Sequence, residues 1–238
     1  MRKVVCSFKS EAILFSLIII GFIFTAGPAL GVDMSTSNKA PEGYVGKPAG
    51  GIGGSSITPP PGYILENEPI CEDGWIDIWN GGCNSDPYVF EAINCRDVIL
   101  GTSGTYNFST HSFRDTDWFE IDILHQSDIR MEGMADFDVQ FLIIDGQQGC
   151  TSPSIISWGL ANAGEMLTIR ATEVPPGKYW LWVGPQSFVG VDCGSQYWFR
   201  SYCQAITVPT LSEWGMILLS LLMAATGFTF MWRRQKTA

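Results

Sequence analysis

Residues 117–124 read DWFEIDIL, and this stretch carries the pattern that decides the fold. Phe119, Ile121 and Ile123 alternate with two acidic residues. Because successive side chains of a β-strand point to opposite faces, the alternation predicts a strand with one buried and one solvated face. Similar short runs, separated by Gly, Pro, Asn and Asp, occupy the chain around it.

Eight such runs lie between residues 64 and 207, where no long helical periodicity is visible. Short strands with turn residues between them are typical of a β-sandwich or a jelly roll. We therefore predict an all-β fold: a single disulfide-stapled sandwich or jelly roll of about eight strands, flanked by an N-terminal signal helix and a C-terminal transmembrane helix. The expected strands are 105–110, 117–124, 128–133, 139–145, 154–159, 166–171, 178–184 and 196–202.

The first 31 residues have the layout of a secretory signal, with a basic start, an apolar core and small residues before Val32. We expect a signal peptide over 1–31, with an uncleaved anchor helix as the alternative. Residues 32–63 are rich in Gly, Pro, Ser and Thr and hold few large apolar side chains. Such a segment buries too little surface to offset its ordering entropy, so we interpret it as a flexible linker before a domain at 64–207.

The cysteines fit an exported domain. Removal of the signal takes away Cys6 and leaves six, and an even number in an exported chain predicts three disulfides with their pairing open. Tetrahedral zinc prefers closely spaced Cys or His ligands, and the chain has no CxxC pair and only two histidines, which disfavours a structural zinc site. The six are Cys71, Cys83, Cys95, Cys150, Cys193 and Cys203.

The charge of the chain is acidic, with 14 Lys and Arg against 24 Asp and Glu and a formal net charge of −10. Between residues 32 and 207 there are 8 basic and 22 acidic residues, a net charge of −14. Such a domain repels phosphate backbones, which argues against nucleic acid as a partner. We interpret the acidic surface mainly as a solvated exterior, part of which is available to bind cations.

Three segments resemble the bacterial pre-peptidase C-terminal family of β-sandwich modules. They are RDTDWFEIDI at 114–123, DFDVQFLIID at 136–145 and VPPGKYWLWVGP at 174–185. The resemblance covers roughly residues 66–203, and the chain departs from the family in its six cysteines and many tryptophans. It implies an accessory, non-catalytic domain of the kind found beside secreted hydrolases.

Acidic pairs at strand starts are the candidate metal ligands. Asp115 and Asp117 share one face of an expected strand, as do Asp136 and Asp138, because alternate strand residues point the same way. Hard carboxylate oxygens suit calcium, the one cofactor we consider, and hydrogen bonding at turns is the alternative role. Some modules of the resembled family bind calcium near their N-terminal edge. In this chain that edge would include Glu66, Glu68 and Glu72 or Asp73.

Three tryptophans raise a second kind of binding site. Trp180 and Trp182 fall on one face of an expected strand, and Trp198 takes a similar place on another. If these strands are neighbours, the rings form an aromatic platform for stacking on sugars. The alternative is that the Cys-rich segment covers that face, because large aromatic side chains are mostly buried.

A catalytic site finds little support in the sequence. GTSGT at 101–105 resembles a nucleophile elbow, but Thr105 stands where the Gly-x-Ser-x-Gly pattern needs its second glycine. His111 and His125 would meet a serine and an aspartate only through the fold, as in any secreted domain. We expect no enzyme and keep a secreted hydrolase as a distant alternative.

The C-terminus has the composition of a membrane span. Residues 216–231 are uncharged and mostly apolar, and Trp214 and Trp232 bracket them. Their length predicts a transmembrane helix over about 214–232. The basic stop after it marks the cytoplasmic end, which places the domain outside. The stop consists of Arg233, Arg234 and Lys236.

The residues that lead into this helix, VPTLSEWG at 208–215, resemble the IPTL-type CTERM sorting signal, in which Ile-Pro-Thr-Leu-Ser-x-Trp-Gly precedes an apolar helix and an arginine cluster. The resemblance implies a Gram-negative envelope protein cut near the motif by an exosortase-like membrane transpeptidase; a plain anchor is the alternative. Pro209 keeps the approach extended, because the residue before proline avoids helix. The motif consists of Val208, in place of the usual Ile, Pro209, Thr210, Leu211, Ser212, Glu213, Trp214 and Gly215.

The sequence therefore predicts an exported cell-surface protein with a non-enzymatic structural or adhesive β-sandwich. The expected partners are signal peptidase, the exosortase-like enzyme, the inner membrane as a transient stop, and envelope polysaccharide. The expected location is the inner membrane during export and then the cell surface or extracellular matrix. A carbohydrate-binding module that uses the tryptophan platform is the alternative function.

Overall fold

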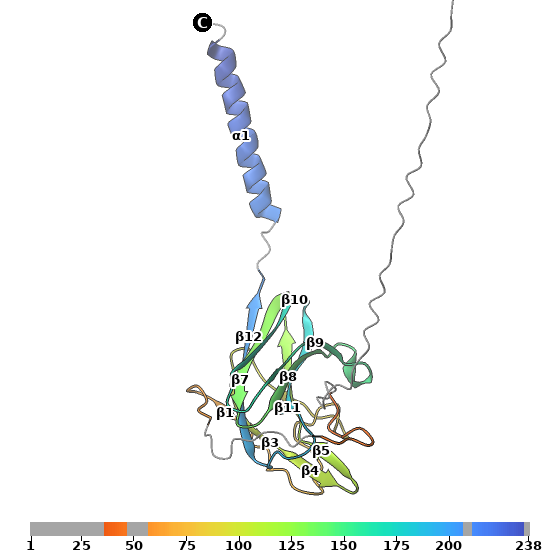
Figure 1. Cartoon of the computed structure of the whole chain (residues 1–238). Coiled ribbons are helices and arrows are strands. Elements are labelled where there is room, and N and C mark those ends of the chain that lie inside the picture. Colours follow the sequence, from red (N-terminus) through yellow and green to blue (C-terminus); the bar gives the residue numbers. More distant parts are fainter. Residues whose placement is uncertain (1–35, 47–56, 207–210, 236–238) are drawn as a thin grey trace, which may run out of the picture. The chain divides into compact units, whose positions relative to one another are not determined.

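The computed structural model describes residues 36–46, 57–206 and 211–235. Figure 1 shows the strands of the domain gathered into two packed sheets. The elements in the described residues are β1 Ile64–Leu65, β2 Glu91–Ala92, β3 Val98–Ser103, β4 Thr105–Phe108, β5 His111–Arg114, β6 Asp117–Ile123, β7 Ser127–Ala135, β8 Val139–Asp145, the 3₁₀ helix η1 Gly149–Thr151, β9 Ser154–Ala161, β10 Leu167–Val174, β11 Gly177–Pro185, β12 Ser195–Ala205 and α1 Leu211–Gln235.

The predicted β-sandwich is confirmed. The first sheet has the strand order β1-β3-β12-β7-β10, and the second has the order β2-β6-β11-β8-β9. Neighbours pair antiparallel, except that the two-residue strands β1 and β2 pair parallel at the sheet edges. Each of the eight expected strands is present, and a hairpin of β4 and β5 stands beside the two sheets. The sequence missed β1, β2, β3 and β5.

The main core lies between the two sheets. Phe119, Ile121 and Ile123 are buried in it, as their alternation along β6 predicts. From the other sheet, Ile129 and Phe199 pack into the same cluster. Burial of large apolar side chains contributes about 1.5–3 kcal/mol each, so this layer supplies most of the stability of the fold.

A second apolar layer covers the outer face of the second sheet. Trp118, Trp180 and Trp182 are buried there, together with Leu142 and Ile144. The Cys-rich segment before β2 packs on this layer, where Phe90 stacks on Trp180 with ring centroids 4.7 Å apart. Because the sheet is covered on both faces, β8 and β11 are apolar along nearly their whole length.

The three predicted disulfides form, and the fold determines their pairing. Cys71 joins Cys193, Cys83 joins Cys150, and Cys95 joins Cys203, with 122, 67 and 108 residues of sequence separation. Each bond links the segment before β3 to a distant part of the chain, so the Cys-rich segment is fixed to both sheets.

Parts of the segment expected to be a flexible linker pack on the domain. The backbone N–H of Ala40 donates to Ser112 in the β4–β5 hairpin, and the Tyr44 ring meets Phe188 edge-on at 5.0 Å. Ile57 is buried against Val98 and Trp198. The composition of the segment did not predict these contacts. They depend on a surface formed by residues far along the chain, and only a few apolar side chains of the segment pack on it. Residues 47–56 of this segment lie outside the described residues.

The C-terminal helix α1 contains an apolar span, Trp214–Trp232, that is long enough to cross a membrane. This span agrees with the helix expected over about 214–232. The predicted signal peptide at 1–31 and the motif residues Val208, Pro209 and Thr210 lie outside the described residues.

Candidate metal centre: a buried carboxylate cluster

Five carboxyl groups from three segments meet inside the domain. Glu66 and Glu68 follow β1, Asp77 belongs to the Cys-rich segment, and Asp115 and Asp117 lie at the start of β6. They form two triads that share Glu68: in each, one oxygen from every residue lies within 4.8 Å of the other two. Oxygens bound to one calcium ion are separated by at most about 5 Å, so each triad has the spacing of a cation site.

The aspartates at the start of β6 are deeply buried, and several of their oxygens lack a hydrogen bond. Asp117 is fully inaccessible, and neither of its carboxylate oxygens accepts a hydrogen bond from the described residues. Asp115 is 3% exposed, and its Oδ1 is also without a donor. A buried carboxylate without a partner costs several kcal/mol, so these oxygens favour the binding of a positively charged ligand.

Glu68 occupies the centre of the cluster. Its stem reaches the surface, but both carboxylate oxygens are buried without a hydrogen-bond partner among the described residues. Burial and then the negative charges of Asp115, Glu66 and Asp77 raise the pKa of Glu68 to about 10. Without a cation, this carboxyl would hold a proton at neutral pH.

Glu66 is held by hydrogen bonds that fix its direction. Its Oε1 accepts from the Tyr197 hydroxyl at 2.8 Å and from the Asn80 amide at 2.5 Å, and its Oε2 accepts from the Thr102 backbone N–H at 3.1 Å. Burial raises the pKa of Glu66 to about 7, although these hydrogen bonds lower it. Tyr197 gives its single proton to Glu66, which leaves Asp117 without it.

Electrostatics and donor chemistry identify the ion that fits. Burial, and then the charges of neighbouring carboxylates, raise the pKa of Asp115 and of Asp117 well above the usual range. Burial also raises the pKa of Asp77, against three backbone hydrogen bonds to it. An all-oxygen, carboxylate-rich set of this kind fits calcium, whereas zinc prefers nitrogen and sulfur ligands.

Two surface pockets adjoin the cluster. One pocket of about 180 Å³ is lined by Glu66 and Glu68, and another of about 340 Å³ is lined by Glu66, Trp79 and Glu91. Glu66 and Glu68 are therefore the members of the cluster that border these pockets.

The predicted metal ligands divide into two groups. Asp115 and Asp117 lie in the cluster with Glu66 and Glu68, but Asp136 and Asp138 do not. The Oδ1 of Asp136 accepts from the Gln196 backbone at 3.0 Å, and that of Asp138 accepts from the Ala163 backbone at 3.0 Å. These two residues have the turn-bonding role that was the alternative for them.

Neither of the optional ligands, Glu72 and Asp73, belongs to the cluster. Asp73 instead accepts a hydrogen bond from the Asn107 backbone at 2.7 Å. Sequence reasoning missed Asp77. The only available signal was its place four residues before the Gly81-Gly82 turn, where a carboxylate bonds the backbone N–H groups of Trp79 and Asn80.

The predicted tryptophan platform is wrong. Trp180 and Trp182 are 3% and 0% exposed on the second sheet, whereas Trp198 is 5% exposed on the first sheet and packs against Ile57. The rings neither share a surface nor face solvent. The Cys-rich segment covers the first two, as the alternative expected, although Trp79 itself is exposed.

Gly101 has no side chain, and the carboxylate of Glu66 occupies the space beside it. A Cβ at Gly101 would overlap the Oε2 of Glu66 and the hydroxyl of Tyr197. We expect Gly101→Ala to lower the free energy of unfolding by about 2 kcal/mol, as overpacking does, and to weaken calcium binding because Glu66 must move. Urea unfolding with and without calcium measures both effects. Unchanged stability together with unchanged calcium binding would contradict the position assigned to Glu66.

Comparison with known proteins gives one match to a family model. Residues 207–235 match the model described as the IPTL-CTERM motif. The match covers residues 208–235 of the sorting signal predicted over 208–238, including Leu211–Gln235, the bounds of α1. The chain therefore carries the sorting tail of an exported surface protein.

Among solved structures, the chain is similar to the pre-peptidase C-terminal domain of collagenase from Bacillus anthracis, determined at 1.0 Å. The two are 18% identical, with a TM-score of 0.34, and the match covers 47% of this chain and 92% of that one. The comparison with curated proteins found no match.

Proposed function

We propose that the chain is a cell-surface protein of the bacterial envelope that an exosortase-like enzyme cuts at its sorting tail. Its β-sandwich would bind calcium and serve a non-enzymatic structural or adhesive role outside the cell. The observation that carries the sorting part is the match of residues 207–235 to the IPTL-CTERM motif. The observation that carries the calcium part is the group of buried, unpartnered oxygens on Glu68, Asp115 and Asp117.

The order of features in the tail supports processing by an exosortase-like enzyme. The motif at 208–215 comes first, the apolar span Trp214–Trp232 follows, and basic residues end the chain. Signal peptidase would release the N-terminus, and the span would hold the protein in the inner membrane with the domain outside. The processing enzyme would then grip the extended approach at Pro209.

The calcium site supports a mechanical role for the domain. Glu66 and Glu68 follow an edge strand of the first sheet, Asp117 begins a strand of the second, and Asp77 belongs to the Cys-rich segment. An ion held by these groups would join both sheets and the covering segment at one point. The disulfide between Cys71 and Cys193 already fixes the stretch between Glu68 and Asp77. Such a clamp suits a domain that must stay folded outside the cell.

The sorting assignment is tested by changing the motif in the native host. We expect Pro209→Ala with Thr210→Ala to leave the full-length chain in the inner membrane, because the enzyme loses its recognition sequence. Immunoblots of separated membrane and surface fractions measure the location and size of the protein. The control is Ser220→Ala with Thr229→Ala, which makes a similar double change inside α1 but outside the motif. Normal surface delivery of the motif variant would refute the assignment.

A further inference from the structure

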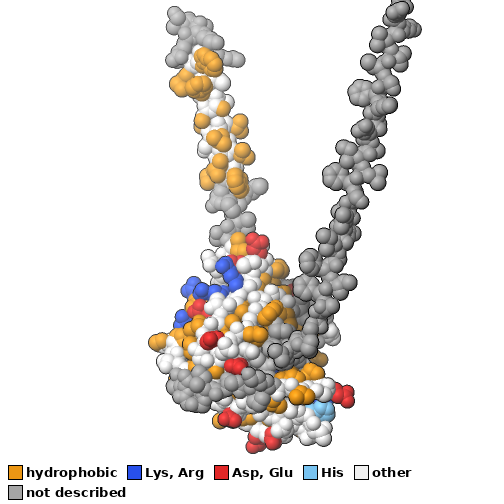
Figure 2. Space-filling model, in the orientation of Figure 1, with side chains coloured by type: hydrophobic (Ala, Val, Ile, Leu, Met, Phe, Trp, Pro, Cys, Tyr) orange, Lys and Arg blue, Asp and Glu red, His pale blue; other side chains and the backbone are white. Residues whose placement is uncertain are grey.

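A group of arginines lies outside the carboxylate cluster, on the outer side of the first sheet. Four of the eight basic residues between 32 and 207 gather there, and Figure 2 shows blue side chains close together on one side of the domain. In a domain with a net charge of −14, this face is a local positive region. The four are Arg96, Arg130, Arg170 and Arg200.

Two of these arginines face each other across neighbouring strands. Arg130 on β7 is directly opposite Arg170 on β10 and, on its other side, opposite Tyr202 on β12. Like charges in directly opposed positions destabilise a sheet. Arg170 pairs with Asp128, and Arg130 lies over the Tyr202 ring, 4.0 Å from its centroid. Arg130 also lies 3.7 Å from the carboxylate of Glu132, so each guanidinium has one acidic neighbour, and a bound anion would lower the repulsion between the two guanidinium groups further.

Arg96 is held at this face in a conformation that favours glycine. Its φ of 79° lies in the left-handed region, which a residue with a Cβ rarely adopts. Its backbone N–H donates to Ser201 at 2.8 Å, and the neighbouring disulfide joins Cys95 to Cys203 on β12. No hydrogen bond or ion pair joins its guanidinium to the described residues. Backbone strain at a position with a free charged side chain indicates a functional role for that side chain.

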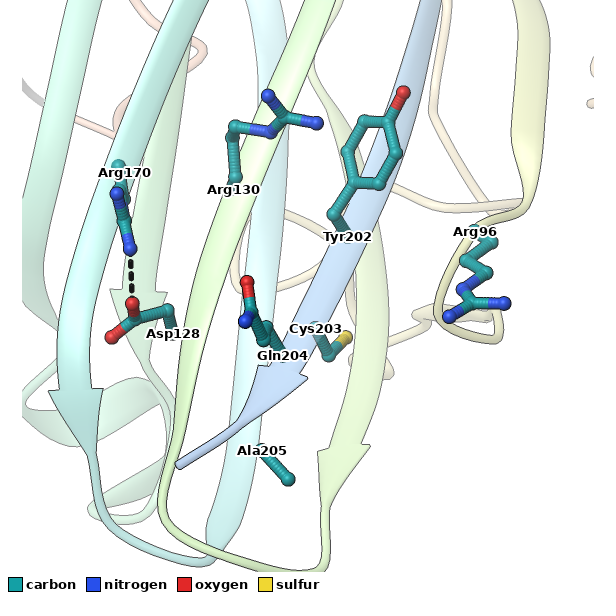
Figure 3. A pocket seen from close by; sticks show the side chains of 8 residues that line it. All are labelled: Arg96, Asp128, Arg130, Arg170, Tyr202, Cys203, Gln204 and Ala205. Atoms are coloured by element: carbon teal, nitrogen blue, oxygen red, sulfur yellow. Dashed lines mark hydrogen bonds and ion pairs between the residues drawn. The ribbon is translucent and has the colours of Figure 1, made fainter. Parts of the chain in front are cut away.

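Three of the four arginines, Arg96, Arg130 and Arg170, line a pocket of about 520 Å³, which is within the size range of small-ligand sites. Figure 3 shows Arg130 and Tyr202 projecting from adjacent strands, with Arg170 joined to Asp128 beside them. Most of the lining side chains are polar or charged. They include Arg96, Asp128, Arg130, Arg170, Tyr202 and Gln204.

We propose that this pocket binds an anionic sugar residue, a uronate unit of an acidic polysaccharide. Guanidinium groups bind carboxylates through two parallel hydrogen bonds. Arg96 can offer them directly, and Arg130 can offer the N–H groups that do not face Glu132, whose carboxylate lies 3.7 Å away. Asp128, which only accepts hydrogen bonds, suits the hydroxyl groups of a sugar. The inference assigns a class of ligand to the adhesive role that we proposed. It rests on the proposed function only for the placement of the domain outside the cell.

Other anionic partners fit the pocket less well. A membrane surface is flat and is usually engaged by exposed apolar side chains beside the basic ones, whereas this site is concave and mostly polar. Nucleic acid carries a dense row of phosphates, which the net charge of −14 repels. A polysaccharide with one carboxylate per sugar can place a single anion in the pocket.

The test is calorimetric titration of the full-length chain, purified in nonionic detergent, with a galacturonate trisaccharide. We expect binding that weakens as salt is added, because the attraction is electrostatic. Replacing Arg130 and Arg170 together by Gln should weaken it at least about tenfold, the usual result of losing a charge-assisted contact. The matched control is Lys178→Gln. It removes an exposed cation that pairs with Glu120, and both residues lie on the second sheet, away from the pocket. It should leave the affinity unchanged.

A second variant separates binding from folding. Arg96→Gly removes a guanidinium but places glycine where the backbone is left-handed, so the variant should be at least as stable as the original chain. We expect it to keep or raise the midpoint of thermal unfolding and to bind the trisaccharide several-fold more weakly. Unchanged affinity in both this variant and the Arg130/Arg170 variant overturns the proposal.

Three further results would also overturn it. The first is equal affinity for the neutral galactose trisaccharide, and the second is displacement of the trisaccharide by inorganic phosphate at equal concentration. The third is binding to phosphatidylglycerol vesicles without binding to the trisaccharide. None of these results would alter the processing of the tail or the response to calcium, so a failure here is distinct from a failure of the proposed function.

Discussion

Calcium is expected to raise the free energy of unfolding of this domain by about 4 kcal/mol when the free ion is roughly a thousandfold above its dissociation constant. The reason is that the folded chain gathers five carboxylates, several of them unpartnered, which the unfolded chain separates. Thermal unfolding of the full-length chain, in EDTA and then with calcium, measures the gain. The same midpoint in both conditions would exclude the site.

Replacing one ligand should have opposite effects on stability in EDTA and in calcium. Asp117→Asn replaces a fully buried ionisable group by a neutral amide of the same shape, so in EDTA at neutral pH it should be as stable as the original chain or more stable. With calcium it should be the less stable of the two, because the affinity falls at least about tenfold.

The matched control for this variant is Asp136→Asn. Asp136 lies outside the cluster, and an amide oxygen can still accept the hydrogen bond from Gln196. This control should keep the full response to calcium. A loss of response in the control, or a full response in Asp117→Asn, would contradict the assignment of ligands.

Without calcium, the stability of the domain is expected to fall as the pH rises. A carboxyl whose pKa is raised by folding holds its proton more tightly in the folded state, so its contribution is complete below the usual value and is lost above it. For Glu66 this window runs from the ordinary value of 4.5 to about 7, and for Glu68 it runs from 4.5 to about 10. Each carboxyl can contribute a slope of about 1.4 kcal/mol per pH unit in its window.

Urea unfolding in EDTA between pH 5 and 8 measures this slope. With calcium present the fall should disappear, because the ion replaces the protons and neutralises the same oxygens. Calorimetry of calcium binding at pH 7 in buffers of different ionisation enthalpy should also detect release of protons. Stability that is flat or rises with pH in EDTA would show that the carboxyls are not buried as described.

The sequence predicted the sandwich because most strands bury one face. In β6 the alternation of Phe119 and Ile121 with acidic residues is a local signal that needs no partner. β3 was not predicted because Gly101 interrupts its apolar run, and that glycine is explained by the side chains of Glu66 and Tyr197, which fill the space beside it. Strands β1 and β2 are two residues long and exist only as pairings to a sheet edge.

The candidate site was partly predictable for the same reason. Asp115 and Asp117 are two residues apart, so their common face could be read locally. Asp136 and Asp138 have the same spacing but different neighbours, and spacing does not distinguish a ligand from a turn-bonding residue. Asp77 reaches the cluster through an irregular segment, which leaves no periodic signal. The burial of Trp180 depends on Phe90, which lies in that same irregular segment.

The place of β12 in the first sheet has a consequence for the order of folding. It is the last strand in the sequence, yet it lies at the centre of its sheet, bonded to β3 on one side and to β7 on the other. A chain that leaves the export channel N-terminus first therefore cannot join these two strands until residue 205 has emerged. Only five residues, 206–210, then separate β12 from Leu211, where α1 begins, so the sheet is completed close to the membrane and late in export.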